Sequence, residues 1–212
     1  MAAEFSIIGI AGPTNTGKTT LNSELGRRII PSPTVFSFDE YDLFPSGSEA
    51  MEKELIEHNI VNWEDPALFD EQAYVKDLER IKKGMPIVLQ TRSRESLASG
   101  EALRSINPTD LNIVEGVFLY HDPGARELFD FRFYIDLPIE EMIRRRLART
   151  PIDSNDPWDQ REYIEGEMLR GTQLYVTPQK EHAHIVLDGL LPTQQLADIV
   201  MSNIAKLGIP AR

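Results

Sequence analysis

Residues 12–20 read GPTNTGKTT and fit the spacing G-x-x-x-x-G-K-[ST] of a phosphate-binding loop. In such a loop, backbone N–H groups and the positive end of the following helix face the phosphates of a nucleotide. Lys18 is expected to reach the β- and γ-phosphate oxygens, and the Thr19 hydroxyl is expected to bind Mg²⁺. We therefore predict that ATP and Mg²⁺ bind at this loop. Its predicted nucleotide-binding residues are Gly12, Thr14, Asn15, Thr16, Gly17, Lys18, Thr19 and Thr20.

Asp39 is the first of several acids that could take part in the reaction. It ends a strand-like apolar segment at residues 34–38, so in a parallel sheet it would point toward the phosphate loop. A carboxylate there could accept the proton of an attacking hydroxyl group or hold water on the metal. The alternative is an aspartate that caps a turn. Glu40 and Asp42 are close enough to compete for this role, and we assign Tyr41 to the acceptor side.

Glu115 and a run of arginines are further candidates. Glu115 closes a buried strand in NIVEG, where it could contact magnesium through water or form a hydrogen bond with the backbone. IRRRLART at residues 143–150 places Arg145 and Arg149 four residues apart on a helix, where they could clamp phosphoryl oxygens. The alternative is a solvated helix face. We predict that Arg145 and Arg149 are catalytic, together with Lys18 and Asp39, and that Arg146 binds the nucleotide.

The elements that must position these side chains alternate along the chain. FSIIGIA before the loop is typical of a buried strand, and Leu21, Leu25 and Ile29 after it recur at helical spacing, which argues against a chance match in an ordinary turn. Other compact apolar runs and amphipathic patterns indicate an α/β fold with a mainly parallel sheet and helices on both faces. The runs lie at 34–38, 85–89, 111–115, 131–136 and 184–188, and the helical patterns at 74–81, 139–147 and 196–207.

Composition narrows the class of protein and its partners. The chain has 212 residues, which favours a single domain covering residues 1–212. Its 34 acidic and 22 basic residues give a net charge of −12, which would repel a nucleic-acid backbone or an anionic membrane. The absence of cysteine excludes a disulfide framework, and no apolar run approaches the roughly 18 residues that span a bilayer. Because no basic region precedes the first apolar stretch, we expect no signal peptide and a cytoplasmic protein.

Several segments resemble motifs of the uridine kinase-like nucleoside kinases and follow one another in the same order along the chain. This group includes nicotinamide riboside kinases and is related to phosphoribulokinase and bacterial pantothenate kinase. IIGIAGPTNTGKTTL resembles the phosphate loop of nicotinamide riboside kinases, and VNWEDPALFD resembles the N-F-D-H-P-x-A-F-D segment of uridine kinases. IVEGVFLY, RRRLART and TPQKEHAHIVLDG also have counterparts in the group. The resemblance implies a P-loop NTPase three-layer fold, with a small lid at about residues 144–158 and an acceptor-binding insertion at about residues 43–96.

This resemblance also implies an activity: transfer of the γ-phosphoryl group of ATP to the 5′-hydroxyl group of a ribonucleoside, with uridine or cytidine as the first candidates. By position, Asp39 is the general base, Glu115 is the acid at the strand end, and the three arginines lie in the lid. Glu64 stands where uridine kinases have an aspartate that holds the ribose hydroxyl groups, so its carboxylate is displaced by about one methylene.

The same comparison of motifs places three more residues at the acceptor. Trp63 stands where nicotinamide riboside kinases have a stacking tyrosine. Arg92 and Arg94 stand in VLQTRSRES, where the tyrosine and histidine that read the pyrimidine in uridine kinases are not evident. Two arginines could meet a carbonyl-rich or anionic acceptor.

Other acceptors and another class of protein remain as alternatives. Nicotinamide riboside is the nearest rival acceptor, followed by pantothenate or a sugar phosphate. The alternative class is a nucleotide switch or regulatory ATPase, which hydrolyses ATP without an acceptor. Asp39, Glu64 and the arginine run favour the kinase, because a switch would not need them together.

Overall fold

The computed structural model describes residues 5–43, 64–90, 103–149 and 164–208. The centre of the protein is a parallel sheet of five strands in the order β2-β5-β1-β6-β7. Parallel neighbours need crossover connections, and helices supply them here. The strands are β1 (Ser6–Ala11), β2 (Thr34–Ser37), β5 (Leu111–Gly116), β6 (Phe131–Asp136) and β7 (Ile185–Asp188).

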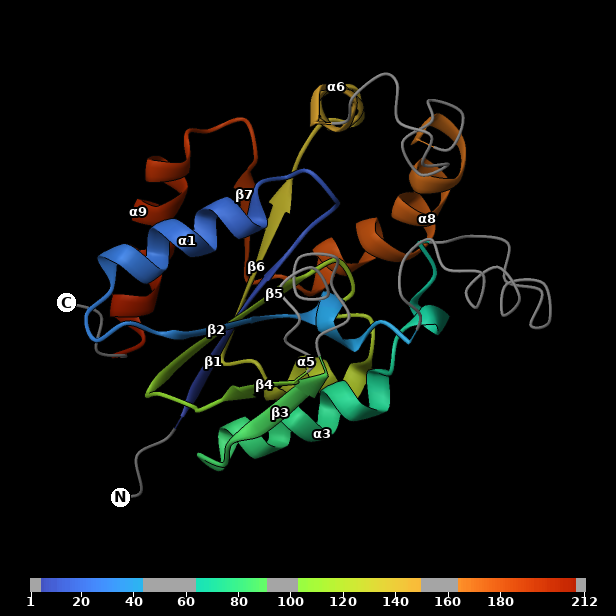
Figure 1. The fold of residues 1–212 in the computed structure, drawn as a ribbon. Helices are drawn as coiled ribbons and strands as arrows, with labels where there is room; N and C mark the ends of the chain where they lie inside the picture. Colours follow the sequence, from blue (N-terminus) through green and yellow to red (C-terminus); the bar gives the residue numbers. More distant parts are fainter. Residues whose placement is uncertain (1–4, 44–63, 91–102, 150–163, 209–212) are drawn as a thin grey trace.

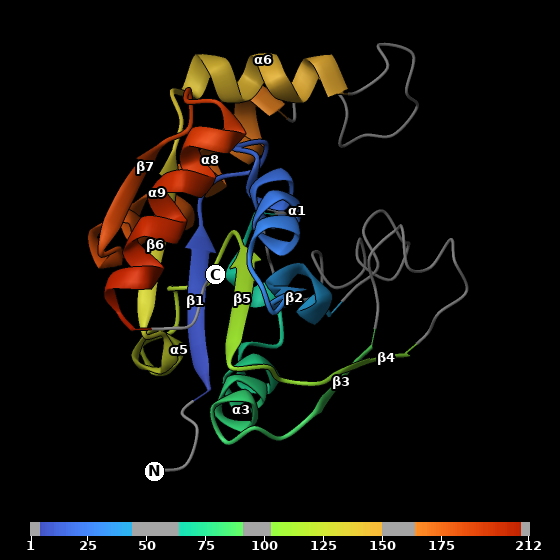
Figure 2. The same ribbon diagram turned by 90° about the vertical axis from the view of Figure 1, so that its left-hand side faces the viewer.

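Helices cover both faces of this sheet (Figure 1 and Figure 2). Successive residues of β1 divide between the faces, because side chains alternate along a strand. Ile7 belongs to the core under one pair of helices, and Ile8 belongs to the core under the other pair. This arrangement confirms the predicted α/β fold. The first pair is α3 (Glu71–Lys82) with α5 (Pro123–Leu128), and the second pair is α1 (Lys18–Arg28) with α9 (Thr193–Lys206).

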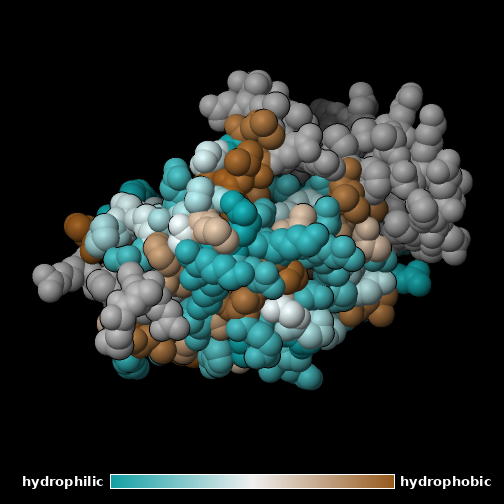
Figure 3. All heavy atoms as spheres, turned by 90° about the horizontal axis from the view of Figure 1, so that it is seen from below, coloured by the Kyte–Doolittle hydropathy of each residue, from teal (hydrophilic) through white to brown (hydrophobic). Residues whose placement is uncertain are grey.

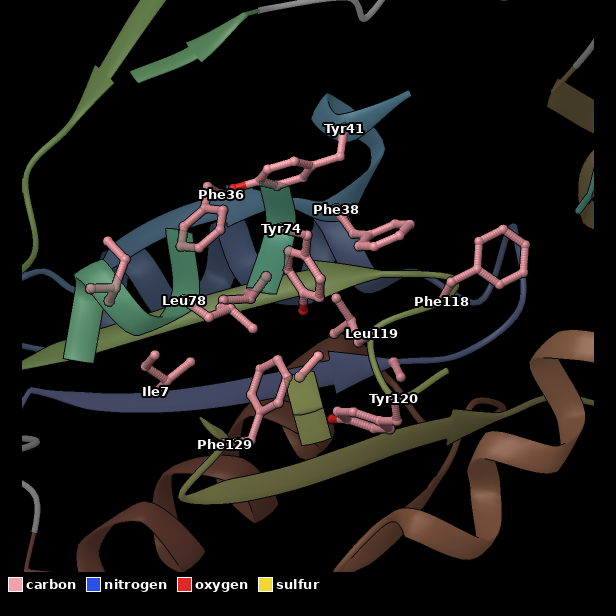
Figure 4. Close-up of a cluster of buried hydrophobic side chains, with 14 of the residues drawn as sticks. Ile7, Phe36, Phe38, Tyr41, Tyr74, Leu78, Phe118, Leu119, Tyr120 and Phe129 are labelled. Atoms are coloured by element: carbon pink, nitrogen blue, oxygen red, sulfur yellow. The ribbon is translucent and has the colours of Figure 1, made fainter. Parts of the chain in front are cut away.

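The core between the sheet and α3 is rich in aromatic rings (Figure 4). Phe38 comes directly after β2, and its ring centroid lies 4.8 Å from that of Tyr74 in an edge-on arrangement. The centroid of Phe69 lies 5.0 Å from that of Phe38. Such pairs contribute beyond the area that they bury. Because Asp39 is the next residue, this cluster fixes the backbone from which Asp39 projects.

The segment at residues 85–89 is not part of the parallel sheet, so that expectation is wrong. β3 (Ile87–Gln90) instead pairs antiparallel with β4 (Leu103–Ile106) in a separate two-stranded sheet. Ile87 and Leu89 are buried, whereas Val88 between them is 61% exposed. A strand with one buried face is typical of antiparallel pairing, whereas a central parallel strand is buried on both faces. β3 packs against α3 and against the 3₁₀ turn Phe38–Tyr41 that follows β2.

α6 (Ile139–Arg149) follows β6 and lies beyond the carboxyl ends of the strands (Figure 2), which confirms the helical pattern predicted there. A second helical stretch, at residues 164–182, lies outside the predicted helices. Its buried side chains include Ile164, Met168, Thr172 and Val176, at every fourth residue. Two of its turns are π-helical, and one of these buried side chains is polar, so the usual apolar pattern of a helix is hidden. The stretch comprises Ile164–Met168, α8 (Leu169–Gly171), Thr172–Val176 and Thr177–His182.

The surface seen from below Figure 1 is mostly hydrophilic, with separate hydrophobic patches (Figure 3). Among the helices within the described ranges, none combines the length and the hydrophobicity that a membrane span requires.

Candidate active site

The phosphate loop joins β1 to α1 and contains three residues with positive φ: Gly12 at 150°, Asn15 at 60° and Gly17 at 92°. At Gly12 a Cβ atom would lie 2.6 Å from the carbonyl oxygen of Ile135 on β6, so any other side chain would clash there. Gly17 is the N-cap residue of α1. Turns that alternate between right- and left-handed backbone conformations direct successive N–H groups toward one point, which suits an anion at a helix N-terminus.

Lys18 is buried and folds back over this loop. Its Nζ donates hydrogen bonds of 2.9 Å to the carbonyl oxygens of both Gly12 and Pro13. Burial lowers the pKa of Lys18, and the nearby carboxylates of Glu115, Asp39 and Glu64 oppose that effect. The ammonium group is thus held at the mouth of the loop, where a bound phosphate would be a stronger partner than a carbonyl oxygen.

Glu115 is the last residue but one of β5 and lies beside the start of α1. Its Oε1 accepts a hydrogen bond of 3.2 Å from the Thr19 hydroxyl. Burial raises the pKa of Glu115, while Lys18 lowers it. A hydroxyl and a carboxylate side by side fit Mg²⁺, which takes oxygen ligands and is usually held by one or two protein groups together with phosphates and water. The described residues contain no group of three or more histidine, cysteine, aspartate or glutamate side chains that could hold a metal ion.

Asp39 lies in the 3₁₀ turn after β2 and is exposed to the same cleft as Lys18. Its backbone N–H donates to the Ser37 hydroxyl at 3.2 Å, so Ser37 caps the turn. Burial among protein groups raises the pKa of Asp39, and Lys18 opposes this. The residue is open to the cleft, yet protein groups crowd its carboxylate and limit its hydration. Such a carboxylate can receive a proton more readily than one in open water.

The neighbours of Asp39 have other partners. Glu40 forms an ion pair with Arg104 of β4, and both residues line the cleft. Tyr41 is buried, and its hydroxyl donates to Asp77 on α3 at 3.0 Å. Asp42 forms an isolated antiparallel bridge with Phe69. Asp39 is therefore the acid of this turn that is best placed to accept a proton.

The cleft that contains these groups has a volume of about 1240 Å³, enough for a nucleotide together with a small acceptor. Two arginines of α6, Arg145 and Arg149, line the cleft. Arg146 does not line it, and its role stays a prediction. Arg145 donates to Glu141 at 2.7 Å and to the carbonyl oxygen of Gly189 at 3.0 Å. These bonds hold its guanidinium group at the edge of the cleft.

The cleft also includes residues that the sequence did not predict, and two groups of them carry functional interest. The loop between β7 and α9 lines it with residues 189–193, and β4 contributes Arg104. DGLLPT after the last strand carries a signal for the first part, because it follows a strand end at the same edge of the sheet as Asp39 and Glu115. Arg104 has no comparable signal, since its strand pairs outside the main sheet.

The acceptor side is partly described. Glu64 is half-buried and close enough to act on the pKa of Lys18. The predicted acceptor residues Trp63, Arg92 and Arg94 lie outside the described residues, as do residues 150–158 of the predicted lid and part of the predicted insertion.

Comparisons with known proteins identify the family of the chain. Residues 7–197 match the phosphoribulokinase / uridine kinase family. A uridine kinase from Staphylococcus epidermidis is 24% identical over 208 residues, with 96% of this chain and 97% of that protein covered. Uridine kinase-like protein 3 from Arabidopsis thaliana is 24% identical over 196 residues, with 92% of this chain and 38% of that protein covered. A solved structure of a possible uridine kinase from Bacillus stearothermophilus is similar in fold, with a TM-score of 0.53, 20% identity, and 89% of this chain and 91% of that one covered.

The chain therefore belongs to the phosphoribulokinase / uridine kinase family, as the sequence motifs indicate. It is a phosphotransferase with an α/β P-loop fold, and its family implies the use of ATP and a small-molecule substrate.

Proposed function

We propose that this member of the phosphoribulokinase / uridine kinase family transfers the γ-phosphoryl group of ATP to the 5′-hydroxyl group of a ribonucleoside, with uridine or cytidine as the first candidates. One observation carries the proposal: Asp39 and Lys18 share one cleft, and Glu64 and Glu115 are close enough to act on Lys18. A triphosphate bound by Lys18 would then meet carboxylates that can receive a proton and hold hydroxyl groups. We place this activity in the cytoplasm.

In the proposed reaction Asp39 accepts the proton of the 5′-hydroxyl group as its oxygen attacks the γ-phosphorus atom. Lys18, Arg145 and Arg149 stabilise the negative charge on the phosphoryl oxygens during transfer. Thr19 and Glu115 would hold Mg²⁺, which neutralises part of the charge of the phosphates when it is bound. The phosphoryl group moves from ATP to the acceptor, and ADP leaves.

The donor side extends along α6 and the loop after β7. Gly189 and its neighbours up to Thr193 line the cleft beside α1, so we assign the nucleoside part of ATP to this loop. We further propose that residues 144–158 act as the lid and residues 43–96 as the acceptor-binding insertion. Within these ranges the structure describes the end of α6, which presents Arg145 and Arg149, and the segment that carries Glu64.

The charges around the acceptor support an uncharged or cationic molecule. Asp39, Glu40 and Glu115 line the cleft, and Glu64 acts on Lys18 from nearby. Arg104 lines the cleft as well, but its charge is balanced by Glu40. We assign Lys18, Arg145 and Arg149 to the phosphoryl oxygens, so among the described residues the carboxylates remain for the acceptor and would repel an anionic one. Nicotinamide riboside, a cation, is therefore the second candidate, ahead of pantothenate and sugar phosphates.

An ADP-release assay tests the proposal with a panel of acceptors: uridine, cytidine, 2′-deoxyuridine, nicotinamide riboside, pantothenate and ribulose 5-phosphate. We expect turnover with a ribonucleoside and a kcat/KM at least about tenfold lower for its 2′-deoxy form, because Glu64 would lose a hydroxyl donor. The Glu64→Gln variant should reduce this difference. Equal kcat/KM values for both forms would remove Glu64 from the ribose site. ADP release that no acceptor stimulates would favour the regulatory ATPase instead.

A further inference from the structure

The carboxylate of Asp65, the residue after Glu64, accepts two hydrogen bonds from different parts of the chain. Oδ1 accepts a hydrogen bond of 2.9 Å from the backbone N–H of Ala67, which caps the 3₁₀ turn Pro66–Leu68. Oδ2 accepts a hydrogen bond of 3.1 Å from the hydroxyl group of Tyr175. Tyr175 belongs to the second π-helical turn, 110 residues further along the chain. One side chain therefore shapes its own turn and ties it to a distant helix.

The segment that carries Glu64 is also attached to the segment that carries Asp39. The N–H of Leu43 donates to the carbonyl oxygen of Leu68, and the N–H of Asp70 donates to the carbonyl oxygen of Tyr41, both at 2.9 Å. These bonds fix residues 68–70 against the turn after β2. The beginning of the segment, next to Glu64, lies beyond this attachment. There the two bonds of Asp65 hold the chain.

Tyr175 is itself held firmly enough to serve as an anchor. Its ring lies edge-on to that of His121, with 6.3 Å between centroids. His121 Nδ1 lies 2.7 Å from the Glu71 carboxylate at the start of α3. Gln179 donates to the backbone carbonyl oxygen of Tyr175 at 2.8 Å. Partial burial and the Asp65 carboxylate raise the pKa of Tyr175, so its hydroxyl group stays protonated and donates.

We propose that Tyr175 and Asp65 are positioning residues for the acceptor: their hydrogen bond holds the turn from which Glu64 faces the ribose hydroxyl groups. This inference rests on the proposed function of Glu64. Neither Tyr175 nor Asp65 lines the cleft of the phosphate loop. Loss of their bond should therefore weaken acceptor binding and leave ATP binding unchanged, because the turn must be ordered again each time an acceptor binds.

The Tyr175→Phe variant tests this, because it removes one hydroxyl group and keeps the ring. With uridine as the acceptor, we expect its KM to rise by about fivefold or more while the KM for ATP changes by less than about twofold. The ratio of kcat/KM for uridine over 2′-deoxyuridine should fall. Asp65→Asn should stay close to wild type, since its amide can still cap the turn and bind the tyrosine oxygen.

Tyr120→Phe is the matched control. The hydroxyl group of Tyr120 also donates to an acceptor within the protein, the carbonyl oxygen of Phe133 at 2.9 Å, but it is buried away from the cleft. We expect this variant to lower Tm without a selective effect on the KM for uridine. If the role of Tyr175 is only structural, Tyr175→Phe will likewise lower Tm without a selective effect on the KM for uridine.

Asp65→Ala removes the bond from its other side and must give the same acceptor-specific increase in KM, which covers the case in which Tyr175→Phe does not fold. An unchanged KM for uridine, or equal increases in both KM values, would overturn the inference. The wild-type ratio of uridine to 2′-deoxyuridine tests Glu64 separately. If the wild type and Tyr175→Phe prefer uridine over 2′-deoxyuridine by the same ratio of kcat/KM, the positioning role of Tyr175 is refuted and the role of Glu64 is not.

Discussion

At the scale of single residues, Asp39 combines the properties that a general base needs. It is exposed to the cleft, and the protein groups that crowd its carboxylate raise its pKa. The Ser37 cap fixes its backbone. Lys18 opposes the raised pKa, which favours the ionised carboxylate that must accept the proton. Ser37 is paired with Glu115 across β2 and β5, and its hydroxyl group lowers the pKa of Glu115. The Ser37 side chain therefore lies between the backbone of the proposed base and the proposed metal ligand.

Replacing Asp39 with asparagine tests its role. Asp39→Asn keeps the shape but cannot accept the proton, so kcat should fall by about 10²–10⁴ while ATP still binds. If Asp39 instead holds water on the metal, high magnesium should partly rescue the variant. Measuring kcat across a magnesium titration, together with nucleotide affinity, separates the two roles. A loss of less than about threefold at every magnesium concentration would exclude both and turn attention to Glu40 or Asp42.

How far the sequence predicts the site differs among residues. Lys18, Thr19 and Gly12 follow from fixed motif spacing, and Asp39 and Glu115 follow from strand ends that meet at one edge of a parallel sheet. Arg104 could not be predicted, because its position depends on the pairing of β4 with β3, which no local pattern reveals. The contact between Asp65 and Tyr175 spans 110 residues and depends on packing alone.

At the scale of elements, the start of α3 is joined to the loop after β5 by Glu71 and His121. His121 Nδ1 lies 2.7 Å from the Glu71 carboxylate, and this hydrogen bond is the largest effect that raises the pKa of His121 above its ordinary value of 6.5. Folding therefore favours the protonated ring. The stabilisation is fully present below the ordinary pKa and is lost as the pH rises through the higher pKa of the folded protein.

Thermal unfolding of His121→Gln tests this link between elements. The variant should have a lower Tm than the wild type at about pH 5.5, and the difference should shrink at about pH 9. His184→Gln is the matched control with the opposite sign. Burial, followed by the charge of Arg132, lowers the pKa of His184. The decrease in Tm caused by His184→Gln should therefore be smallest at low pH. A His121→Gln difference that does not depend on pH would show that the charge of the ring plays no part.

The helical elements were predictable where their apolar periodicity is regular. α3 and α9 bury residues at helical spacing, and α6 buries Met142 with Ile143 and Leu147 partly buried beside it. The patterns at 74–81, 139–147 and 196–207 match these helices. The stretch at residues 164–182 buries Thr172 and Gln179 among apolar side chains and contains π-helical turns. Its periodicity is therefore unlike that of an α-helix, and tertiary packing, rather than local pattern, determines it.

At the scale of the whole molecule, the fold gathers cations at one edge of an acidic protein. The chain carries a net charge of −12, yet Lys18, Arg145 and Arg149 line one cleft at the carboxyl ends of the strands. They come from α1 and α6, which lie far apart in the sequence. A nucleotide in the cleft would contact both elements and the loop before α9, so its binding should stabilise the whole domain.

Ligand-induced stabilisation tests this arrangement without any acceptor. Mg²⁺ with a non-hydrolysable ATP analogue at about 100 times its Kd should stabilise the native state by about 2.7 kcal/mol, which raises the Tm of a domain of this size by roughly 5–10 °C. Lys18→Ala should fold and lose most of this shift, because the buried ammonium group beside the phosphates is gone. Lys83→Ala is the control and should keep the full shift. Lys83 is exposed at the end of α3, and its ammonium group lies 4.0 Å from the Glu79 carboxylate. An equal shift in both variants would place the nucleotide away from the phosphate loop, because removing a charge that contacts its phosphates must weaken binding.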